Sequence, residues 1–433
     1  MIHGWGNVGG IDAEIIPMHA GEPPARVLAG NAPLIARGLG RSYGDSALAP
    51  RVLDTRDCRR VLEFDEQQGL LVAEAGLSLA QIVAQWAPRG WFLPVTPGTR
   101  HVTLGGAVAA DVHGKNHHHD GSFSEHVAWL RLMLADGSVL RCSSTENREL
   151  FLATAGGMGL TGVILEVALQ MRPIQGRWIR QRVRRHADLA SLMGAFEHSQ
   201  QPAYTVAWLD CSTPRRAGRG IVFDGEHAGA RYTAMAGTPP RRRQMNVPVF
   251  MPNWLLNGYS ARAFNSLYYL RAREGDTLVP LERFFYPLDT LGHWNRLYGR
   301  RGFVQYQCVV PSGAGAAGVR ALVEAIAASG EPSLLAVLKL FGPGNEAYLS
   351  FPREGWTLAV DFPATPGVFD LLKRLDAMVL EQGGRLYLSK DVRMDRRTFE
   401  AGYPALEQFL AVKERVDPHH RFASLQSQRL GLT

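Results

Sequence analysis

The chain has 433 residues, of which 46% are hydrophobic, so it is long enough to bury a large core and to form two or three domains. Its 47 basic and 40 acidic residues leave a net charge of +7, a mild excess that suits nucleic acid, anionic lipid or a phosphorylated substrate. No apolar run has the length of a transmembrane helix and the N-terminus has no signal-peptide pattern, so we expect a cytoplasmic or peripherally membrane-associated protein.

Residues 1–175 are rich in glycine and in short apolar runs that are typical of β-strands. Leu79, Ile82, Val83 and Trp86 recur at three- and four-residue spacing, which predicts a helix over residues 78–90. An Asp-Gly pair at 136–137 between apolar runs predicts a tight hairpin. Strands are predicted at 26–30, 70–76, 91–95, 162–171 and on both sides of the hairpin within 126–142. This part of the chain is therefore a mixed α and β domain.

From residue 178 the chain changes to longer alternating strands interleaved with amphipathic helices. The predicted strands lie at 203–210, 301–311, 334–342 and 356–364, and the predicted helices at 316–330 and 367–384. This order favours an antiparallel sheet with helices on one face, which is an α+β arrangement. A helix-rich tail follows over 401–424.

Three glycine-dense stretches stand out in the first part, at 37–47, 96–123 and 153–164. Glycine lets the backbone approach a ligand closely and offer its amides to an anion, most often a pyrophosphate. None of the stretches is a Walker A loop, and none has the spacing of the Rossmann fingerprint. Three such loops in one domain predict a large dinucleotide bound along an extended cleft.

Two other residue patterns bear on metal binding. Four histidines, at positions 113 and 117–119, lie within seven positions, but spacing alone does not define a zinc site. The cysteines, Cys58, Cys142, Cys211 and Cys308, are far apart and form no CxxC pair. We therefore expect no metal site and no disulfide framework, and we expect reduced, mostly buried cysteines.

Several segments together resemble one family. They are "RGLGRSYGD" (37–45), "PVTPGTRHVTLGGAVAADVHGKNHHHDGSF" (94–123), "ATAGGMGLTG" (153–162), "FFYPLD" (284–289), "QYQCVVP" (305–311), "LKLFGPGN" (338–345) and "LSKD" (388–391). This set resembles FAD-binding flavoproteins of the vanillyl-alcohol oxidase type, and within them the decaprenylphosphoryl-β-D-ribose 2′-oxidase family. The resemblance covers nearly the whole chain, and the combination is more specific than any single glycine motif.

The resemblance implies a two-domain α+β fold of the vanillyl-alcohol oxidase (PCMH) type. Residues 1–177 would form the first part of the FAD-binding domain, 178–384 a substrate-binding domain on an antiparallel sheet, and 385–433 a segment that returns to the FAD-binding domain. The residues expected to bind FAD are Gly38, Gly40, Arg41, Ser42, Tyr43, Gly44, Asp45, Pro97, Gly98, Thr99, Thr103, Gly105, Gly106, Ala107, His113, Gly114, Asn116, Gly121, Ser122, Gly157, Gly162, Val163 and Lys390. Tyr43 stands where many relatives carry the histidine that attaches FAD covalently, so we expect FAD without a covalent bond.

The resemblance also implies the residues of the reaction. Lys390, Tyr43 and His113 are the catalytic candidates, and the base that takes the hydroxyl proton stays open. The expected substrate-binding residues are Lys115, Gln305, Gln307, Lys339 and Asn345. The alternative for Lys390 is a surface lysine at a strand end, and for the glutamines it is pairing across the sheet. Some family members carry a cysteine where this chain has Ala359, so inhibitors that use that thiol should fail here.

The implied function is FAD-dependent oxidation of the 2′-hydroxyl of a polyprenylphosphoryl-β-D-ribose. It would be the first half of an epimerisation to the arabinose form, used in cell-envelope polysaccharide, with a separate NADH-dependent short-chain reductase completing it. The alternative is an oxidase of a soluble sugar or aldonolactone on the same fold. A nucleic-acid binder is disfavoured, because the arginines are not interleaved with aromatics on a recognisable fold.

The segment 239–260 bears on where the lipid is recognised. It mixes Arg241, Arg242 and Arg243 with Phe250, Trp254 and other apolar residues, as a loop that rests on a membrane surface would. The alternative is a solvated loop followed by an ordinary core helix.

Overall fold

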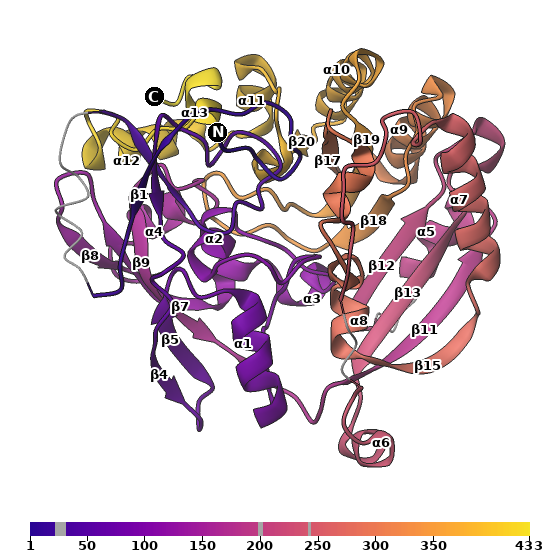
Figure 1. The fold of residues 1–433 in the computed structure, drawn as a ribbon, viewed down its shortest axis with the longest axis horizontal. Coiled ribbons are helices and arrows are strands. Elements are labelled where there is room, and N and C mark those ends of the chain that lie inside the picture. The colour runs from indigo at the N-terminus through magenta and orange to yellow at the C-terminus, as the bar shows by residue number, and fades with distance from the viewer. Residues whose placement is uncertain (22–31, 198–201, 241–243) are drawn as a thin grey trace.

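The computed structural model describes residues 1–21, 32–197, 202–240 and 244–433. Two sheets lie side by side, a five-stranded one in the first part of the chain and an eight-stranded one in the second (Figure 1). The strand predicted at 26–30 lies outside the described residues.

The five-stranded sheet is antiparallel throughout. In spatial order its strands are β4 (Val61–Asp65), β5 (Leu70–Glu74), β9 (Val163–Gln170), β7 (Val127–Met133) and β8 (Val139–Cys142). The predicted hairpin is confirmed, because β7 pairs with β8 around Gly137, whose φ of 86° suits a tight turn. A small parallel sheet lies beside it, formed by β1 (Glu14–Pro17), β3 (Arg51–Asp54) and β2 (Leu34–Arg37).

The described residues of the first part also include the helices α1 (Leu79–Trp86), α2 (Leu104–Ala109), α3 (His117–Asp120) and α4 (Arg148–Thr154). Helix α1 confirms the predicted helix. Ser78 and Gln81 form a capping box at its start, and its four periodic apolar residues are all buried. The four cysteines of the chain are buried free thiols, as expected.

The eight-stranded sheet confirms the antiparallel sheet predicted for the second part, since every neighbouring pair in it is antiparallel. In spatial order its strands are β15 (Gly275–Pro280), β11 (Trp178–His186), β13 (Gly220–His227), β12 (Tyr204–Leu209), β18 (Ala336–Phe341), β19 (Gly355–Pro363), β17 (Phe303–Pro311) and β20 (Arg385–Leu386). The four strands predicted in this part are all present.

The two faces of this sheet differ. Successive side chains alternate, so β17 directs Tyr306 and Cys308 to one face, and Gln305 and Gln307 to the other. The first face is covered by α5 (Leu189–Glu197), α9 (Gly315–Ser329) and α10 (Pro366–Glu381). The glutamine face looks toward the first part of the chain. The prediction of helices on one face was wrong for α7 (Gly258–Arg271) and α8 (Leu281–Phe285), which pack on the glutamine face through aromatic contacts such as Trp208–Tyr268 and Tyr204–Phe284.

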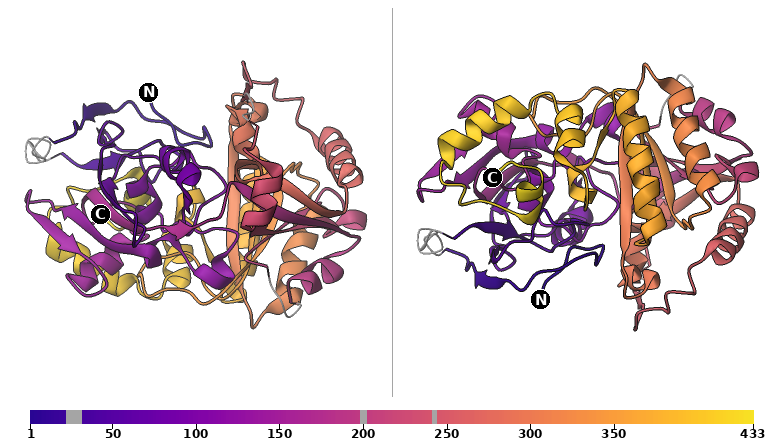
Figure 2. Two further views of the ribbon diagram at one scale, coloured as in Figure 1. Left: turned by 90° about the horizontal axis from the view of Figure 1, so that it is seen from below. Right: turned by 90° about the horizontal axis from the view of Figure 1, so that it is seen from above.

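The C-terminal helices pack against the first part of the chain, where both termini lie (Figures 1 and 2). These helices are α11 (Arg396–Gly402), α12 (Leu406–Val416) and α13 (Leu425–Arg429). Leu34 of β2 exchanges two main-chain hydrogen bonds with the segment 421–423, and α12 contacts α4. The short elements are β6 (Trp91–Phe92), β10 (Arg172–Pro173), α6 (Ala230–Ala236), β14 (Met245–Asn246) and β16 (Leu291–Gly292). No helix within the described ranges is both long and apolar enough to cross a membrane.

Candidate active site

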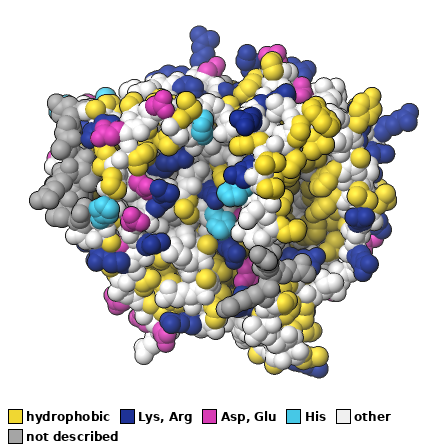
Figure 3. All heavy atoms as spheres, viewed as in Figure 1, with side chains coloured by type: hydrophobic (Ala, Val, Ile, Leu, Met, Phe, Trp, Pro, Cys, Tyr) yellow, Lys and Arg dark blue, Asp and Glu magenta, His cyan; other side chains and the backbone are white. Residues whose placement is uncertain are grey.

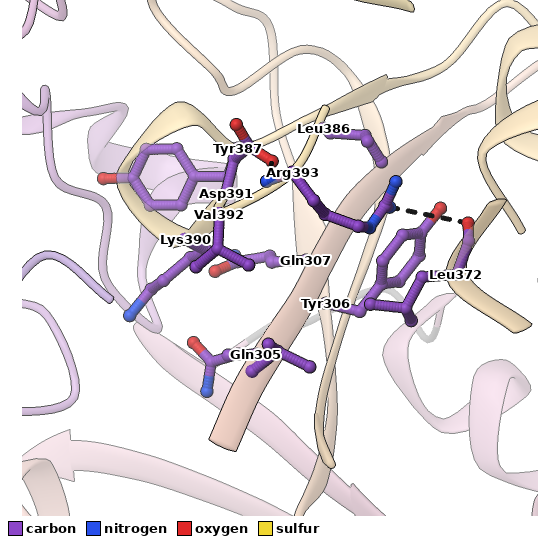
Figure 4. Close-up of a pocket in the computed structure, with 11 residues that line it drawn as sticks. Gln305, Tyr306, Gln307, Leu372, Leu386, Tyr387, Lys390, Asp391, Val392 and Arg393 are labelled. Atoms are coloured by element: carbon purple, nitrogen blue, oxygen red, sulfur yellow. Dashed lines mark hydrogen bonds between the residues drawn. The ribbon is translucent and has the colours of Figure 1, made fainter. Parts of the chain in front are cut away.

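A small pocket is lined by residues of β17, of the segment from β20 to Arg393 and by Leu372 of α10, so its lining includes side chains from both faces of β17. Lys390 ends a short 3-10 helix, η7 (Leu388–Lys390). Figure 4 shows that Lys390, Gln305 and Gln307 extend to the same side of β17, whereas Tyr306 points to the other side. The structure therefore brings these three predicted site residues together, from segments about 80 residues apart along the chain.

Tyr43 belongs to the same group. The Lys390 ammonium nitrogen lies 3.8 Å from the centre of the Tyr43 ring, which is a cation–π contact. The Tyr43 amide donates to the carbonyl of Ser389 at 3.0 Å, so the first glycine loop is tied directly to the lysine turn. Burial raises the pKa of Tyr43 well above its usual value, which keeps the phenol protonated.

Asp361 is the acidic member of this group, and sequence reasoning missed it. It stands opposite Gln305 across the β17–β19 pair, and the Gln305 amide donates to its Oδ1 at 2.5 Å. Its other oxygen, Oδ2, is buried and has no hydrogen-bond partner among the described residues. Burial raises the pKa of Asp361 to about 7, against Gln305 and Lys390, which lower it. A charged residue in the middle of the buried strand "WTLAVDFP" was the available signal.

The pKa of Lys390 is shifted in the opposite direction from that of Asp361. Burial lowers its pKa to about 7, while the charge of Asp361 acts to raise it and that of Lys339 to lower it further. A lysine and a carboxyl group whose pKa values both lie near neutrality are candidates for proton transfer.

His113 is held by Gln307. The Gln307 amide nitrogen lies 2.9 Å from His113 Nε2 and 3.2 Å from Thr357 Oγ1. Burial, followed by the charge of Lys339, holds the pKa of His113 well below its usual value, so the ring is neutral. Because the amide donates to Nε2, the ring proton lies on Nδ1, which is buried and meets no acceptor among the described residues. His113 thus offers one free buried donor.

Two more predicted site residues are lysines, and the charge of Lys339 acts on both His113 and Lys115. Lys115 donates to the carbonyl of Phe284, and its ammonium lies 4.3 Å from the centre of that ring. Burial, with the charge of Lys339, lowers the pKa of Lys115 to about 7, and burial lowers that of Lys339 to about 8. An anion bound beside a lysine with so low a pKa strongly stabilises the charged form of that lysine.

The Asn345 side chain already makes hydrogen bonds within the protein. Its amide donates to Asp111 at 2.8 Å and to Ser122 Oγ at 2.6 Å, and its oxygen accepts from the amide of Ala347. Ser122 pairs with His113 through an isolated β-bridge. Asn345 therefore supports the His113 segment from behind.

The three glycine loops converge on α2. A Cβ at Gly38 would meet Thr103, the N-cap of α2, at 2.3 Å, and Gly156 donates to the carbonyl of Val108 in α2 at 3.1 Å. The main-chain amides of residues 39–42 donate no hydrogen bond within the described part of the chain. Free amides on closely packed glycine backbone fit the phosphates of an extended dinucleotide, as predicted.

The remaining predicted cofactor residues divide between open and structural positions. Gly98 is exposed with open space around it, and Gly40, Gly121 and Gly162 have the positive φ that favours glycine. Several others hold the loops together: Asp45 pairs with Arg429, Thr99 donates to Asp289, Asn116 donates to Pro94, Gly105 packs on Ala75, Gly157 packs on Ala153, and Gly106 donates to Thr103.

The "FFYPLD" motif links the sheet to the second glycine loop. Asp289 accepts from Thr99 Oγ1 at 2.7 Å and from the amide of Arg100 at 2.9 Å. The Tyr286 hydroxyl lies 2.8 Å from Thr96 Oγ1. The motif thus fixes the loop 96–100 against the second part of the chain.

The histidines of the cluster contact other groups, although the rings of His118 and His119 lie side by side with centroids 4.3 Å apart. His117 packs on the Phe341 ring with centroids 4.4 Å apart, and a nitrogen of His118 lies 3.2 Å from the carbonyl of Pro202. Over the ranges that the structure describes, no group of three or more His, Cys, Asp or Glu side chains is placed to hold a metal ion.

The N-terminal segment also reaches the site, which the sequence did not indicate. The amides of Trp5 and Gly6 donate to the carbonyls of Ser42 and Tyr43, and Phe303 of β17 donates to Gly6. The Arg41 guanidinium lies 3.8 Å from the centre of the Trp5 ring. This segment bridges the first glycine loop and the large sheet.

Comparison with known proteins agrees with this geometry. Residues 26–143 match the family model described as an FAD binding domain. The chain is 37% identical to the decaprenylphosphoryl-β-D-ribose oxidase of Mycolicibacterium smegmatis, over 99% of this chain and 97% of that protein. It is 25% identical to the L-gulonolactone oxidase of Scyliorhinus torazame, over 89% of this chain and 86% of that one. A shorter match, 28% identical over 33% of this chain, is to 27% of the human Δ(24)-sterol reductase.

Proposed function

Since the chain belongs to the decaprenylphosphoryl-β-D-ribose oxidase family, we propose that it oxidises the 2′-hydroxyl of a polyprenylphosphoryl-β-D-ribose to the 2′-keto sugar. The protein is an FAD-dependent oxidoreductase of the two-domain α+β type. This oxidation is the first half of an epimerisation of the sugar to the arabinose form.

The single observation that carries the proposal is a set of three partly buried lysines, in which the charge of Lys339 lowers the pKa of the other two. Lys115, Lys339 and Lys390 all have lowered pKa values, so they gain from an anionic ligand. A phosphosugar provides that charge, whereas a neutral free sugar or aldonolactone leaves the buried lysines uncompensated. The cations therefore favour the lipid-linked phosphosugar over the soluble alternative.

FAD, when bound, supplies a two-electron acceptor for the carbon that bears the hydroxyl. We assign its phosphates to the free amides of residues 39–42 and to the loop 96–106, and we infer that it is held without a covalent bond. Residues 1–177 and 385–433 would form its domain, and 178–384 the substrate domain.

The side chains of the site would then bind and orient the sugar. Lys115 and Lys339 would neutralise the phosphate, while the Gln307 amide oxygen would accept a hydrogen bond and the His113 Nδ1 proton would donate one to the ligands. Tyr43, kept protonated by burial, would pack beneath Lys390 and hold its ammonium in place. Asn345 would act by supporting His113, not by touching the sugar.

We assign the hydroxyl proton to the Lys390–Asp361 pair. A pair that holds one proton near neutral pH can accept a second from the substrate without the large penalty of a new buried charge. Gln305 fixes the carboxyl group, and Tyr43 fixes the ammonium.

The proposal includes partners. A separate NADH-dependent short-chain reductase would convert the keto sugar to the arabinose epimer. The lipid substrate requires peripheral contact with a membrane, and Arg241–Arg243, which the sequence suggested for this contact, lie outside the described residues.

The test is the identity of the product. The holoenzyme is incubated with a short-prenyl phosphoryl-β-D-ribose and an artificial electron acceptor, and the product is reduced with borodeuteride. We expect a mass loss of two hydrogens and then deuterium at C2′ of the sugar. Deuterium at another carbon, or an unchanged lipid, would refute the assignment.

A further inference from the structure

Helix α7 presents an apolar face to solvent, which is the reverse of an ordinary surface helix. Tyr259, Leu267 and Leu270 are 83%, 48% and 67% exposed, and with Ala263 they follow the spacing of one helix face. The opposite face carries the residues that are buried, Ala261 and Asn265. In Figure 3 apolar side chains gather on the right-hand part of the viewed face, which carries α7 and the large sheet.

A polar anchor fixes this orientation. The Asn265 amide is 1% exposed and donates to Asp210 Oδ1 at 3.3 Å and to the carbonyl of Ser333 at 3.1 Å. Rotating α7 to bury its leucines would expose this side chain and break both bonds. The apolar face is therefore a built feature of the fold. Trp254, which lies three residues before the helix N-cap Asn257, is also 74% exposed.

Arginines flank the apolar face on both sides. An open hollow of about 730 Å³ beside α7 is lined by Arg215, Arg216 and Arg262, with Ser266 accepting a hydrogen bond from Arg216 at 2.6 Å. Arg271 stands on the other flank of the face, at the end of the helix. The hollow has no carboxylate in its lining, and α7 has no acidic residue. The cations therefore face solvent with their charge uncompensated.

We propose that the α7 face is the surface by which the protein docks on an anionic phospholipid membrane. Aromatic and leucine side chains enter the interface, and the flanking arginines bind lipid phosphates, a pattern that suits a helix lying in the plane of a membrane. A second copy of this chain that docked by the same face would place its own arginines against these arginines, and the acidic residues that follow α7, Glu274 and Asp276, are already paired with Arg185 and Arg182. The inference deepens the proposed function, whose lipid substrate requires contact with a membrane, but its evidence is the surface of α7 and not which sugar is oxidised.

The test is flotation of the holoenzyme with vesicles. Phosphatidylcholine vesicles that contain about 30% phosphatidylglycerol should bind the protein, and pure phosphatidylcholine vesicles should not. The double variant Leu267→Glu/Leu270→Glu and the triple variant Arg215→Gln/Arg216→Gln/Arg262→Gln should each weaken binding by about tenfold or more. Hydrogen exchange over residues 258–271 should slow when the anionic vesicles are added to the unmodified protein.

Matched controls separate this surface from general charge. Arg320→Gln/Arg374→Gln/Arg397→Gln removes the same charge from exposed positions on α9, α10 and α11, and Leu62→Glu changes an exposed leucine of β4. Both controls should bind vesicles as the unmodified protein does.

Equal binding by the α7 variants, or equal binding to both kinds of vesicle, would overturn the proposal. So would a dimer that the leucine variants dissociate without any change in vesicle binding, because a second copy would then occupy the face. Reduction of the flavin by a soluble short-prenyl substrate should be unchanged in the α7 variants, so loss of vesicle binding and failure of the oxidase proposal are read separately.

Discussion

At the scale of single residues, the site depends on two ionisable groups whose pKa values are driven to about 7 from opposite directions. Burial disfavours the charge on both Lys390 and Asp361, and each partly restores the charge of the other. Neither group would show this behaviour in water, where a lysine and an aspartate titrate far apart. Burial in this fold therefore brings the pKa values of an ordinary lysine and an ordinary aspartate together near neutral pH.

Replacing Lys390 tests its role. We expect Lys390→Ala to keep FAD bound but to slow substrate-dependent flavin reduction by about 10²- to 10⁴-fold, because the variant loses half of the proton pair. Rapid mixing under anaerobic conditions measures the rate, and flavin absorbance of the purified protein measures FAD content. Lys373→Ala, at an exposed position on α10, is the matched control. Bleaching at the unmodified rate in Lys390→Ala would remove the lysine from the mechanism.

The pH dependence tests Asp361. In the unmodified enzyme, the rate of flavin reduction should rise as the pH is raised through about 7, because the fully protonated pair has no room for the hydroxyl proton. Asp361 acts to raise the pKa of Lys390, so in Asp361→Asn the remaining inflection should move to lower pH by about one unit or more, with a slower rate. Asp370→Asn, an exposed change, should leave the profile in place. A profile that Asp361→Asn does not move would show that the carboxyl group has no part in the proton step.

Most predicted site residues were accessible from motifs, but Asp361 was not. Lys390, Tyr43, His113 and Gln307 lie in segments with distinctive residue types, and the structure places them in one group, although their chemical roles stay predictions. Asp361 lies in a strand that reads as an ordinary buried run, and only its pairing with Gln305 across β17 and β19 reveals its position. Cross-strand register was not predicted from the sequence, so this neighbour was missed.

At the scale of elements, close backbone packing holds the first glycine loop against the lysine turn. A Cβ at Gly44 would lie 1.9 Å from the carbonyl oxygen of Asp391, where backbone cannot yield cheaply. The position needs glycine for this close approach. The same packing carries the hydrogen bond from Tyr43 to Ser389.

Gly44→Ala tests this contact. We expect the variant to lose FAD affinity and to unfold more easily, by about 1–3 kcal/mol, because the loop and the lysine turn must separate. Gly313→Ala, at a turn where a Cβ meets no atom within 4 Å, is the control and should behave as the unmodified protein. Thermal unfolding and flavin content are the measurements. A Gly44→Ala variant as stable and as yellow as the control would contradict the contact.

The cofactor linkage also belongs to this scale, because it depends on which side chain the first glycine loop presents. Tyr43 stands where many relatives carry the histidine that attaches FAD, so we expect precipitation of the protein with acid to release all of the FAD into the supernatant. Flavin that stays with the precipitated protein would show a covalent bond, and mass spectrometry of the flavin peptide would then decide whether His113 carries it.

Periodicity predicted elements better than their packing. Helices α1, α9 and α10, the hairpin β7–β8 and the strands β12, β17, β18 and β19 follow from alternation and three- or four-residue spacing. Helix α7 was not predicted in this way. An ordinary core helix at the end of the segment 239–260 was only the alternative to a membrane-surface loop, and the structure buries Asn265 and exposes Leu270. Periodicity identifies an apolar face but does not tell whether protein or another phase covers it.

At the scale of the whole molecule, the site lies between two sheets that are formed by distant parts of the chain. The "FFYPLD" motif and the N-terminal segment join them, through Asp289 at the second glycine loop and through Gly6 at β17. Sequence patterns predicted both sheets but not their relative placement, which depends on these long-range contacts. The domain boundaries stay predictions.

The most direct test of the oxidase assignment is the anaerobic absorbance of the purified holoenzyme. It is mixed with a short-prenyl phosphoryl-β-D-ribose and, separately, with free sugars and aldonolactones. We predict that the flavin absorbance bleaches with the prenyl phosphosugar alone, because only that substrate brings a phosphate to Lys115 and Lys339. Bleaching by a free sugar or a lactone, with none by the phosphosugar, would contradict the assignment and place the enzyme with oxidases of soluble substrates.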